Sequence, residues 1–140
     1  MAIVVGYLAD TSVLHRVGRS REIADRVATL RNENELWTCD VVSLELGYSA
    51  RNPQEWAAIS SVHRRLHQAA TTPKVTERAL EVQGLLAAAG HHRVPVSDLL
   101  IASAAESASV AVLHYDRDFD VIAGVTKQPV EWVLPAGTVG

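Results

Sequence analysis

The stretch Ile3-Val4-Val5-Gly6-Tyr7-Leu8-Ala9-Asp10-Thr11-Ser12 is apolar and β-branched until it stops at a carboxylate followed by two hydroxyls. Such residues favour a pleated strand, and a nearly continuous apolar run fits a strand covered on both faces. Asp10-Thr11-Ser12 is a place where a chain can leave a strand and enter a helix. If the strand is central in a parallel sheet, Asp10 lies at its carboxyl end, where open α/β folds place their sites. The local sequence leaves open a second role, in which Asp10 only caps the helix.

The composition is that of a folded globular protein. The length of 140 residues fits a single domain, 1–140, and 48% of the residues are hydrophobic. The net charge of −3 excludes a broadly basic nucleic-acid coat, so a nucleic-acid partner would need a local basic patch. The single cysteine, Cys39, indicates a reducing compartment, and its apolar neighbours favour a buried residue over a nucleophile. No apolar run approaches the roughly 20 residues of a membrane span, and no signal peptide is recognisable, so we expect a cytoplasmic protein.

Apolar periodicity predicts strands and helices in alternation. Further strands are predicted at 36–39, 110–114 and 130–134. The run Tyr115–Asp120, just beyond the strand at 110–114, carries three alternating acids, and a polar turn would explain them if they stood alone. The order of elements indicates an α/β fold with a mostly parallel sheet. Helices are predicted from about 12 to 30 with a break near Gly18, and at 43–52, 54–70, 73–90 and 97–106.

Four carboxylates from separate segments are expected at one edge of this sheet. Asp10 and Asp116 follow strands, whereas Glu45 and Asp98 lie in the first turns of helices, with Ser43 as the predicted N-cap of the helix that carries Glu45. Clustered carboxylates repel one another unless a cation joins them. Oxygen ligands without His or Cys suit Mg²⁺ or Mn²⁺, and such ions promote displacement at a phosphodiester. Capping by Asp98, or by the serine before it, remains an alternative explanation for that acid.

Two histidines have a spacing that could indicate a zinc site. His63 and His67 stand four residues apart on the helix predicted at 54–70, a spacing that zinc ligands use. The intervening Arg64-Arg65-Leu66 lacks the glutamate of the metalloprotease pattern, and its two cations disfavour a metal. A polar helix face, basic enough to touch RNA, is the preferred interpretation.

Taken together, the acidic motifs resemble those of PIN domains. They are Asp10-Thr11-Ser12, the run Ser43–Arg51 around Glu45, Asp98–Ala102 and Asp116–Phe119, and they cover essentially the whole chain. A small PIN domain with these motifs looks like a VapC toxin of a prokaryotic VapBC toxin–antitoxin system. The resemblance implies a three-layer α/β/α fold around a mostly parallel sheet and a Mg²⁺-dependent endoribonuclease. It also implies a homodimer and inhibition by a cognate VapB antitoxin.

The resemblance also implies roles for single residues. We expect Asp10 and Asp98 to hold a Mg²⁺ (or Mn²⁺) ion directly, Asp116 to bind it directly or through water, and Glu45 to orient the attacking water. Whether Asp116 or Asp118 points at the ion is open, since in an extended stretch both would face the same side. In full, the implied site consists of the quartet Asp10, Glu45, Asp98 and Asp116, with Asp118 as an auxiliary ligand and Thr11 as a hydroxyl near the metal or the phosphate.

One stretch departs from the family pattern. Many relatives carry a small hydroxyl or amide residue shortly before the fourth acid, where this chain has His114-Tyr115. The ordering of water or of Asp116 is therefore expected to differ. Arg16 and Arg51 are candidates for contacts to the RNA backbone, and the RNA itself (tRNA, rRNA or mRNA) is open.

Three other function classes share some of these features. Lys127 near Pro129 faintly resembles the Lys-Pro of a phospho-accepting receiver domain, but a receiver would carry an acidic pair after its first strand. A phosphatase of the haloacid dehalogenase type would carry a second aspartate where Ser12 stands. A PIN scaffold that only binds a protein partner is the third alternative, and loss of metal affinity would be its signature.

Overall fold

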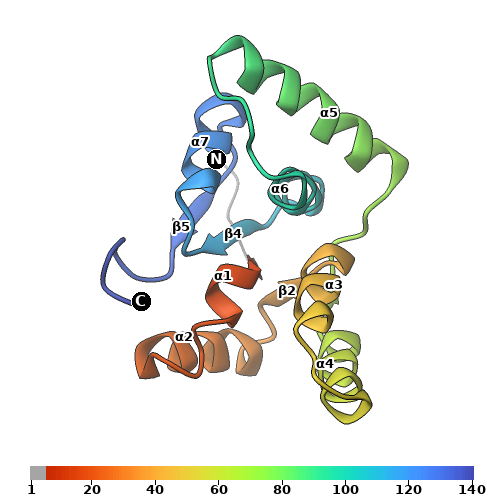
Figure 1. The fold of residues 1–140 in the computed structure, drawn as a ribbon, viewed down its shortest axis with the longest axis vertical. Helices are drawn as coiled ribbons and strands as arrows, with labels where there is room; N and C mark the ends of the chain where they lie inside the picture. Colours follow the sequence, from red (N-terminus) through yellow and green to blue (C-terminus); the bar gives the residue numbers. More distant parts are fainter. Residues whose placement is uncertain (1–5) are drawn as a thin grey trace.

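A computed structural model describes residues 6–140, which form a central sheet with helices on both faces (Figure 1). All strand pairs in this part of the chain are parallel, and the strand order is β3-β2-β1-β4-β5. The predicted three-layer α/β/α fold is thus confirmed. The predicted strand residues 3–5 lie outside the described range. The strands are β1 (Tyr7–Ala9), β2 (Leu36–Thr38), β3 (His67–Gln68), β4 (Ala111–His114) and β5 (Val130–Trp132).

Helices join each strand to the next, because parallel strands cannot be joined by a tight turn. None of the helices within residues 6–140 is both long and apolar enough to cross a membrane. They are α1 (Thr11–Leu14), α2 (Arg21–Asn32), α3 (Asp40–Tyr48), α4 (Pro53–Arg65), α5 (Pro73–Ala88), α6 (Val96–Ala108) and α7 (Arg117–Thr126).

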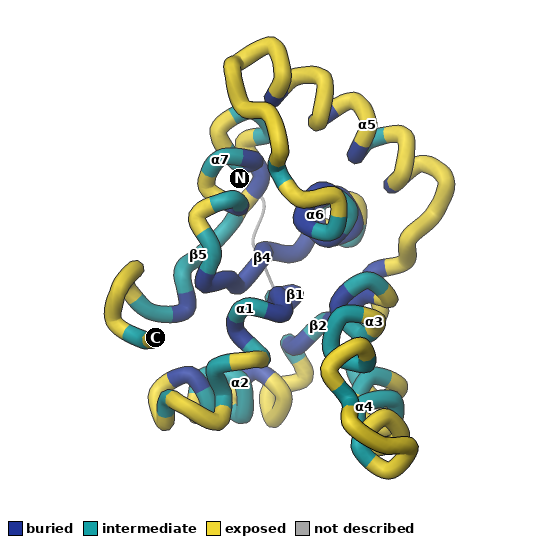
Figure 2. Tube along the Cα trace, in the orientation of Figure 1, coloured by how far each residue is buried: buried dark blue, intermediate teal, exposed yellow. Residues whose placement is uncertain are grey.

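Residues on the two faces of the sheet belong to two hydrophobic clusters. Because successive strand residues point to opposite faces, Leu8 joins one cluster and Ala9 the other, and Val112 and Leu113 divide in the same way. The larger cluster includes residues of α5, α6 and α7, and the smaller one includes residues of α1 and α2. Helix α6, seen end-on in Figure 2, is deeply buried, as its apolar sequence predicts.

The strand order places the candidate site. From β1 the chain adds β2 and β3 on one side, and then returns to add β4 and β5 on the other side of β1. The order of strands therefore reverses between β1 and β4. Open α/β sheets bind ligands outside the carboxyl ends of the strands at such a reversal. Asp10 follows β1 and Asp116 follows β4 shortly after its end, so both lie at this reversal.

Helix α7 occupies a segment in which the sequence patterns predict no helix, and the polar turn considered for its acids is wrong. Phe119 and Ile122 are fully buried and stand three residues apart, the spacing of one helix face. Asp118 and Asp120 lie in the first turn, where carboxylates are favourable with the helix dipole. The three alternating acids that look like a turn are therefore the start of a helix.

Helix α4 ends earlier than the periodicity predicts. It stops at Arg65, and the following residues form the edge strand β3. His63 and His67 consequently do not share a helix face: His67 Nε2 donates to the Asn34 carbonyl, whereas His63 contacts α3. The helical spacing for a zinc pair is thus absent.

Cys39 matches its prediction as a small buried residue. It has no exposed surface, and burial raises the pKa of its thiol to about 11. A thiol with such a pKa is protonated near neutrality and is a poor nucleophile. Its backbone forms the N-cap of α3.

Candidate metal centre

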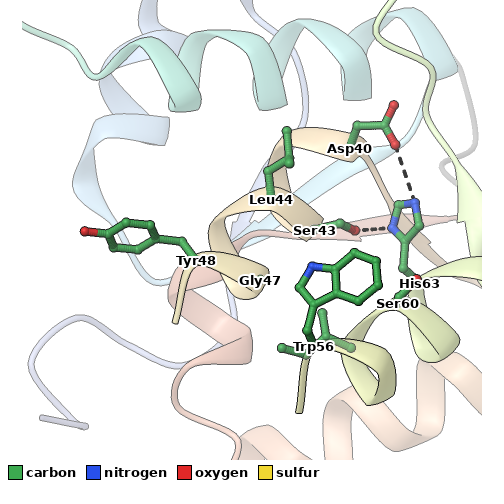
Figure 3. A pocket seen from close by; sticks show the side chains of 9 residues that line it. Asp40, Ser43, Leu44, Gly47, Tyr48, Trp56, Ser60 and His63 are labelled. Atoms are coloured by element: carbon green, nitrogen blue, oxygen red, sulfur yellow. Dashed lines mark hydrogen bonds and ion pairs between the residues drawn. The ribbon is translucent and has the colours of Figure 1, made fainter. Parts of the chain in front are cut away.

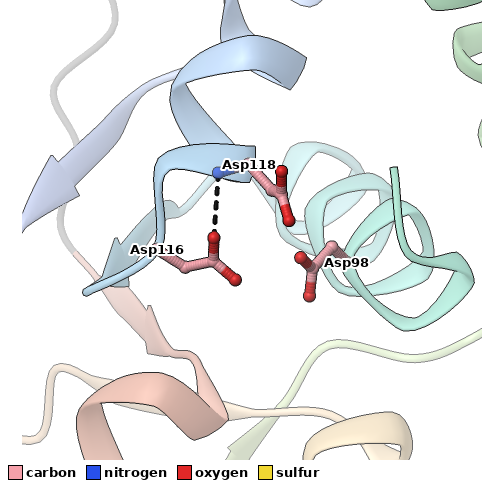
Figure 4. A group of neighbouring side chains, drawn as sticks. All are labelled: Asp98, Asp116 and Asp118. Carbon is pink, nitrogen blue, oxygen red and sulfur yellow. Dashed lines mark hydrogen bonds between the residues drawn. The ribbon is translucent and has the colours of Figure 1, made fainter. Parts of the chain in front are cut away.

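Three carboxylates converge between α6 and the start of α7. One oxygen each of Asp98, Asp116 and Asp118 lies within 4.8 Å of the others (Figure 4). Asp98 is only 6% exposed and projects from the first turn of α6. Neither it nor the preceding serine caps that helix, whose N-cap is Pro95 without a side-chain bond. The capping explanation for Asp98 is therefore wrong.

The start of α7 orients the other two acids of this cluster. Asp116 is the N-cap, and its Oδ1 accepts the Asp118 peptide N–H at 2.9 Å. Asp118 lies in the first helical turn, so the stretch is not the extended segment considered from sequence. The capping turn nevertheless brings both side chains to Asp98. The sequence left open which of the two faces the site, and the fold places both there.

Asp10 combines a cap with a free oxygen. Its Oδ2 accepts the Ser12 peptide N–H at 3.0 Å and the Ser12 hydroxyl at 2.6 Å, which makes it the N-cap of α1. Its Oδ1 is buried and has no hydrogen-bond partner. Capping therefore explains only one of its two oxygens. Asp10 is outside the tightest group of three acids, but its charge acts on Asp98.

Glu45 reaches the site from α3. That helix begins at Asp40, so the predicted N-cap at Ser43 is wrong and Glu45 lies beyond the first turn. The buried Thr11 hydroxyl donates to Glu45 Oε1 at 2.7 Å. Glu45 thus owes its orientation to a residue that directly follows Asp10.

The electrostatics show that these carboxylates act on one another. Burial raises the pKa of Asp98 to about 8, and the charges of Asp10, Asp116, Asp118 and Glu45 add to the rise. Burial also raises the pKa of Asp10, against the lowering effect of its bonds from Ser12. One oxygen of Asp98, like Asp10 Oδ1, is buried without a partner. A cation held by oxygen atoms would supply both the missing charge and the missing partners.

The two candidate RNA-binding arginines are engaged within the chain. Arg16 donates to the Ser12 carbonyl at 2.8 Å, and its guanidinium lies 4.6 Å from the centre of the Tyr115 ring. Arg51 pairs with Glu55 at 2.7 Å but leaves 85% of its side chain exposed. Contact with RNA remains a prediction for both.

Two contacts around the site were not predicted from sequence, although both residues belong to stretches that the sequence singles out. The Ser12 hydroxyl accepts the Tyr115 peptide N–H at 2.9 Å while donating to Asp10, and so links the ends of β1 and β4. His114 Nδ1 accepts the Asp116 peptide N–H at 3.2 Å. A hydroxyl two residues after a capping aspartate is a recognisable signal. The departure at His114-Tyr115 marks where the second contact lies but not its geometry.

A cavity of about 550 Å³ lies between α3 and α4, and none of the candidate metal ligands lines it (Figure 3). There Ser43 hydrogen-bonds His63 Nδ1, and Asp40 lies 3.5 Å from His63 Nε2. The Ser43 peptide N–H is bonded to the Cys39 carbonyl, so it is not free to act as an oxyanion donor. These contacts tie α4 to the helix that carries Glu45.

Comparisons with known proteins identify the family. Residues 7–125 match the PIN domain, and the chain therefore belongs to the PIN-domain family. Ribonuclease VapC51 of Mycobacterium tuberculosis is 41% identical over 133 residues, which cover 95% of this chain and 96% of that protein. Ribonuclease VapC21 of the same species is 38% identical over 94% of this chain and 96% of its own length.

Solved structures share the fold at low sequence identity. DNA-bound VapBC from Salmonella typhimurium superposes with a TM-score of 0.75 at 19% identity, covering 94% of this chain and 100% of that chain. VapBC-1 from nontypeable Haemophilus influenzae gives a TM-score of 0.73 at 21% identity, over 91% of this chain and 97% of that chain. The receiver-domain alternative is excluded, because such domains order their strands 2-1-3-4-5 and this sheet has the order 3-2-1-4-5.

Proposed function

We propose that this chain is the toxin of a VapBC-type toxin–antitoxin pair and a Mg²⁺-dependent endoribonuclease. The observation that carries the proposal is the group of buried and half-buried carboxylates at the sheet reversal, with orphaned oxygens on the buried Asp10 and Asp98. The chain is 41% and 38% identical to two proteins named VapC ribonucleases, and this similarity supports RNA cleavage as the reaction. Mn²⁺ is an alternative ion, because it prefers the same ligands.

The residues that hold the ion in this proposal are Asp98, Asp116 and Asp118, with Asp10 from the neighbouring strand. When bound, such an ion offsets charge on the phosphodiester and makes water a better nucleophile. The carboxylates need to be ionised to hold the ion. Their mutual repulsion disfavours ionisation, and a bound cation favours it.

Glu45 would act on the attacking water. Thr11 donates to Oε1 of Glu45 and so holds the carboxylate in place. Oε2 is then the oxygen that would take the proton of the water as it attacks phosphorus. The leaving 5′- or 3′-oxygen of the cleaved bond takes a proton from solvent.

The partners in this proposal are RNA and a VapB-like antitoxin. Solved structures of the same fold include VapBC complexes, and two of these are bound to DNA. We propose that this chain likewise forms a homodimer that its antitoxin inhibits. The cleavage products will show whether the target is tRNA, rRNA or mRNA.

The test is cleavage of purified RNAs, including tRNAs, with Mg²⁺, with EDTA, and with the variant Asp98→Asn. Asp25→Asn is the matched control, because it makes the same change at an exposed position on α2. We expect cleavage by the unaltered protein and by Asp25→Asn in Mg²⁺ only, and none by Asp98→Asn. Activity in Asp98→Asn would remove Asp98 from the site. Absence of both cleavage and metal binding would instead favour a PIN scaffold without catalysis.

A further inference from the structure

His114 links the end of β4 to the fourth acid. It is the last residue of β4, has no exposed surface, and accepts the Asp116 peptide N–H on Nδ1 at 3.2 Å. We propose that His114 is a positioning residue of the metal centre, whose Nδ1 fixes the peptide of Asp116 and thereby aims the Asp116 carboxylate at Asp98. The inference rests on the proposed metal-dependent function and adds to it a residue outside the acidic group.

The Asp116 peptide has no partner from regular secondary structure. The ladder between β4 and β5 ends where Val133 N–H donates to the His114 carbonyl. Asp116 itself is the extended N-cap of α7, with φ −152° and ψ 119°, so its N–H lies before the helical hydrogen bonds begin. This N–H is partly buried and has no acceptor in a strand or helix, and here a side chain provides one.

The imidazole is held rigidly enough to do this. Its ring centre lies 5.3 Å from that of Phe119 on α7 and 4.9 Å from that of Trp132 on β5. The Trp132 indole N–H in turn donates to Asp120 at 2.7 Å, which anchors β5 to α7. With aromatic rings packed against it, the imidazole cannot rotate freely, so the direction of Nδ1 is set by the core.

The junction between β4 and α7 is thus fixed by two side chains in succession. Tyr115 N–H is held by Ser12 from α1, and Asp116 N–H is held by His114 from β4. Removing either acceptor frees one peptide of the two that connect the sheet to the ligand-bearing turn. Partners that orient metal ligands typically change metal affinity by about 10–100-fold when removed.

The experiment compares His114→Asn with His114→Phe. Asparagine places an amide oxygen as many bonds from Cα as Nδ1 and can accept the same N–H, whereas phenylalanine keeps the ring and loses the acceptor. Val112→Ala is the matched control: Val112 is fully buried two residues earlier on the same face of β4, and its loss costs packing without touching the acceptor. Two readouts are measured: hydrogen–deuterium exchange of the Asp116 amide without metal, and Mn²⁺ affinity from the paramagnetic resonance signal of the free ion.

We expect His114→Phe to exchange the Asp116 amide faster and to bind Mn²⁺ roughly 10–100-fold more weakly. His114→Asn and Val112→Ala should keep slow exchange at Asp116 and stay within a few-fold of the unaltered affinity. Equal behaviour of His114→Phe and His114→Asn in the exchange experiment would overturn the inference. If the unaltered protein cleaves no RNA while the exchange pattern holds, the proposed ribonuclease function fails and the positioning role stands.

Discussion

The Thr11 hydroxyl donates to Glu45 Oε1 at 2.7 Å and joins the start of α1 to the middle of α3. Thr11 directly follows Asp10, so two adjacent residues contribute to the site: Asp10 supplies a carboxylate, and Thr11 holds the carboxylate of Glu45. Thr11 was expected near the metal or the phosphate, and its contact with Glu45 indicates a role through that carboxylate.

Replacing Thr11 by valine, which keeps the shape and removes the hydroxyl, should lower kcat for RNA cleavage. Because misplaced catalytic groups cost up to about 100-fold, we expect a loss of that order with Mn²⁺ affinity little changed. Thr11→Ser keeps the donor and serves as the control, with kcat near that of the unaltered protein. A valine variant with undiminished kcat would show that Glu45 needs no such support.

The stability of the metal-free protein should depend on pH through Asp98. Its pKa is raised from 3.8 to about 8 in the folded chain, so between these values the folded state holds a proton that the unfolded state has released. Stability therefore falls as pH rises through this window and is lowest above about 8. Urea unfolding at a series of pH values, without metal, measures this slope. Asp98→Asn should flatten it and unfold at higher urea at pH 8, and an unchanged slope in that variant would contradict the assignment.

Metal affinity should show the opposite trend. Ligand carboxylates bind a cation in their ionised form, so protons compete with the ion. Below the pKa of Asp98 we expect Mn²⁺ affinity to rise by up to roughly tenfold per pH unit, as expected when one proton is released on binding. Calorimetry in buffers of different ionisation enthalpy counts that proton. Binding that is independent of pH from 5 to about 8 would mean that Asp98 is ionised before the ion arrives.

Much of the site could be predicted because its signals are local. Asp10 directly follows a β-branched apolar run, and Asp98 opens the most apolar helix, so both could be placed at one edge from sequence. The direction in which Asp116 and Asp118 point could not be predicted. It depends on α7, whose short apolar face is interrupted by acids that also suit a turn.

Contacts between distant segments were beyond sequence reasoning for a different reason. The acceptor on His114 depends on how Phe119 and Trp132 pack around its ring. Likewise, β3 forms where the helical period still continues, because its residues pair with β2 along the sheet edge. Tertiary pairing there overrides local propensity, which carries only a few tenths of a kcal/mol, roughly, per residue.

Ser12 provides the last prediction, because its hydroxyl serves two partners at once. It donates to Asp10 at 2.6 Å and accepts the Tyr115 N–H at 2.9 Å. Ser12→Ala leaves that peptide N–H unpaired, at a cost of about 1–3 kcal/mol in the free energy of unfolding. It should also weaken Mn²⁺ binding, because Asp10 loses one of the bonds that orient it.

Ser12→Thr retains the hydroxyl and should keep both properties close to those of the unaltered protein. Urea unfolding and Mn²⁺ titration on the same samples separate the two effects. Loss of stability with full Mn²⁺ affinity would mean that Ser12 supports the fold while Asp10 is oriented by the backbone alone.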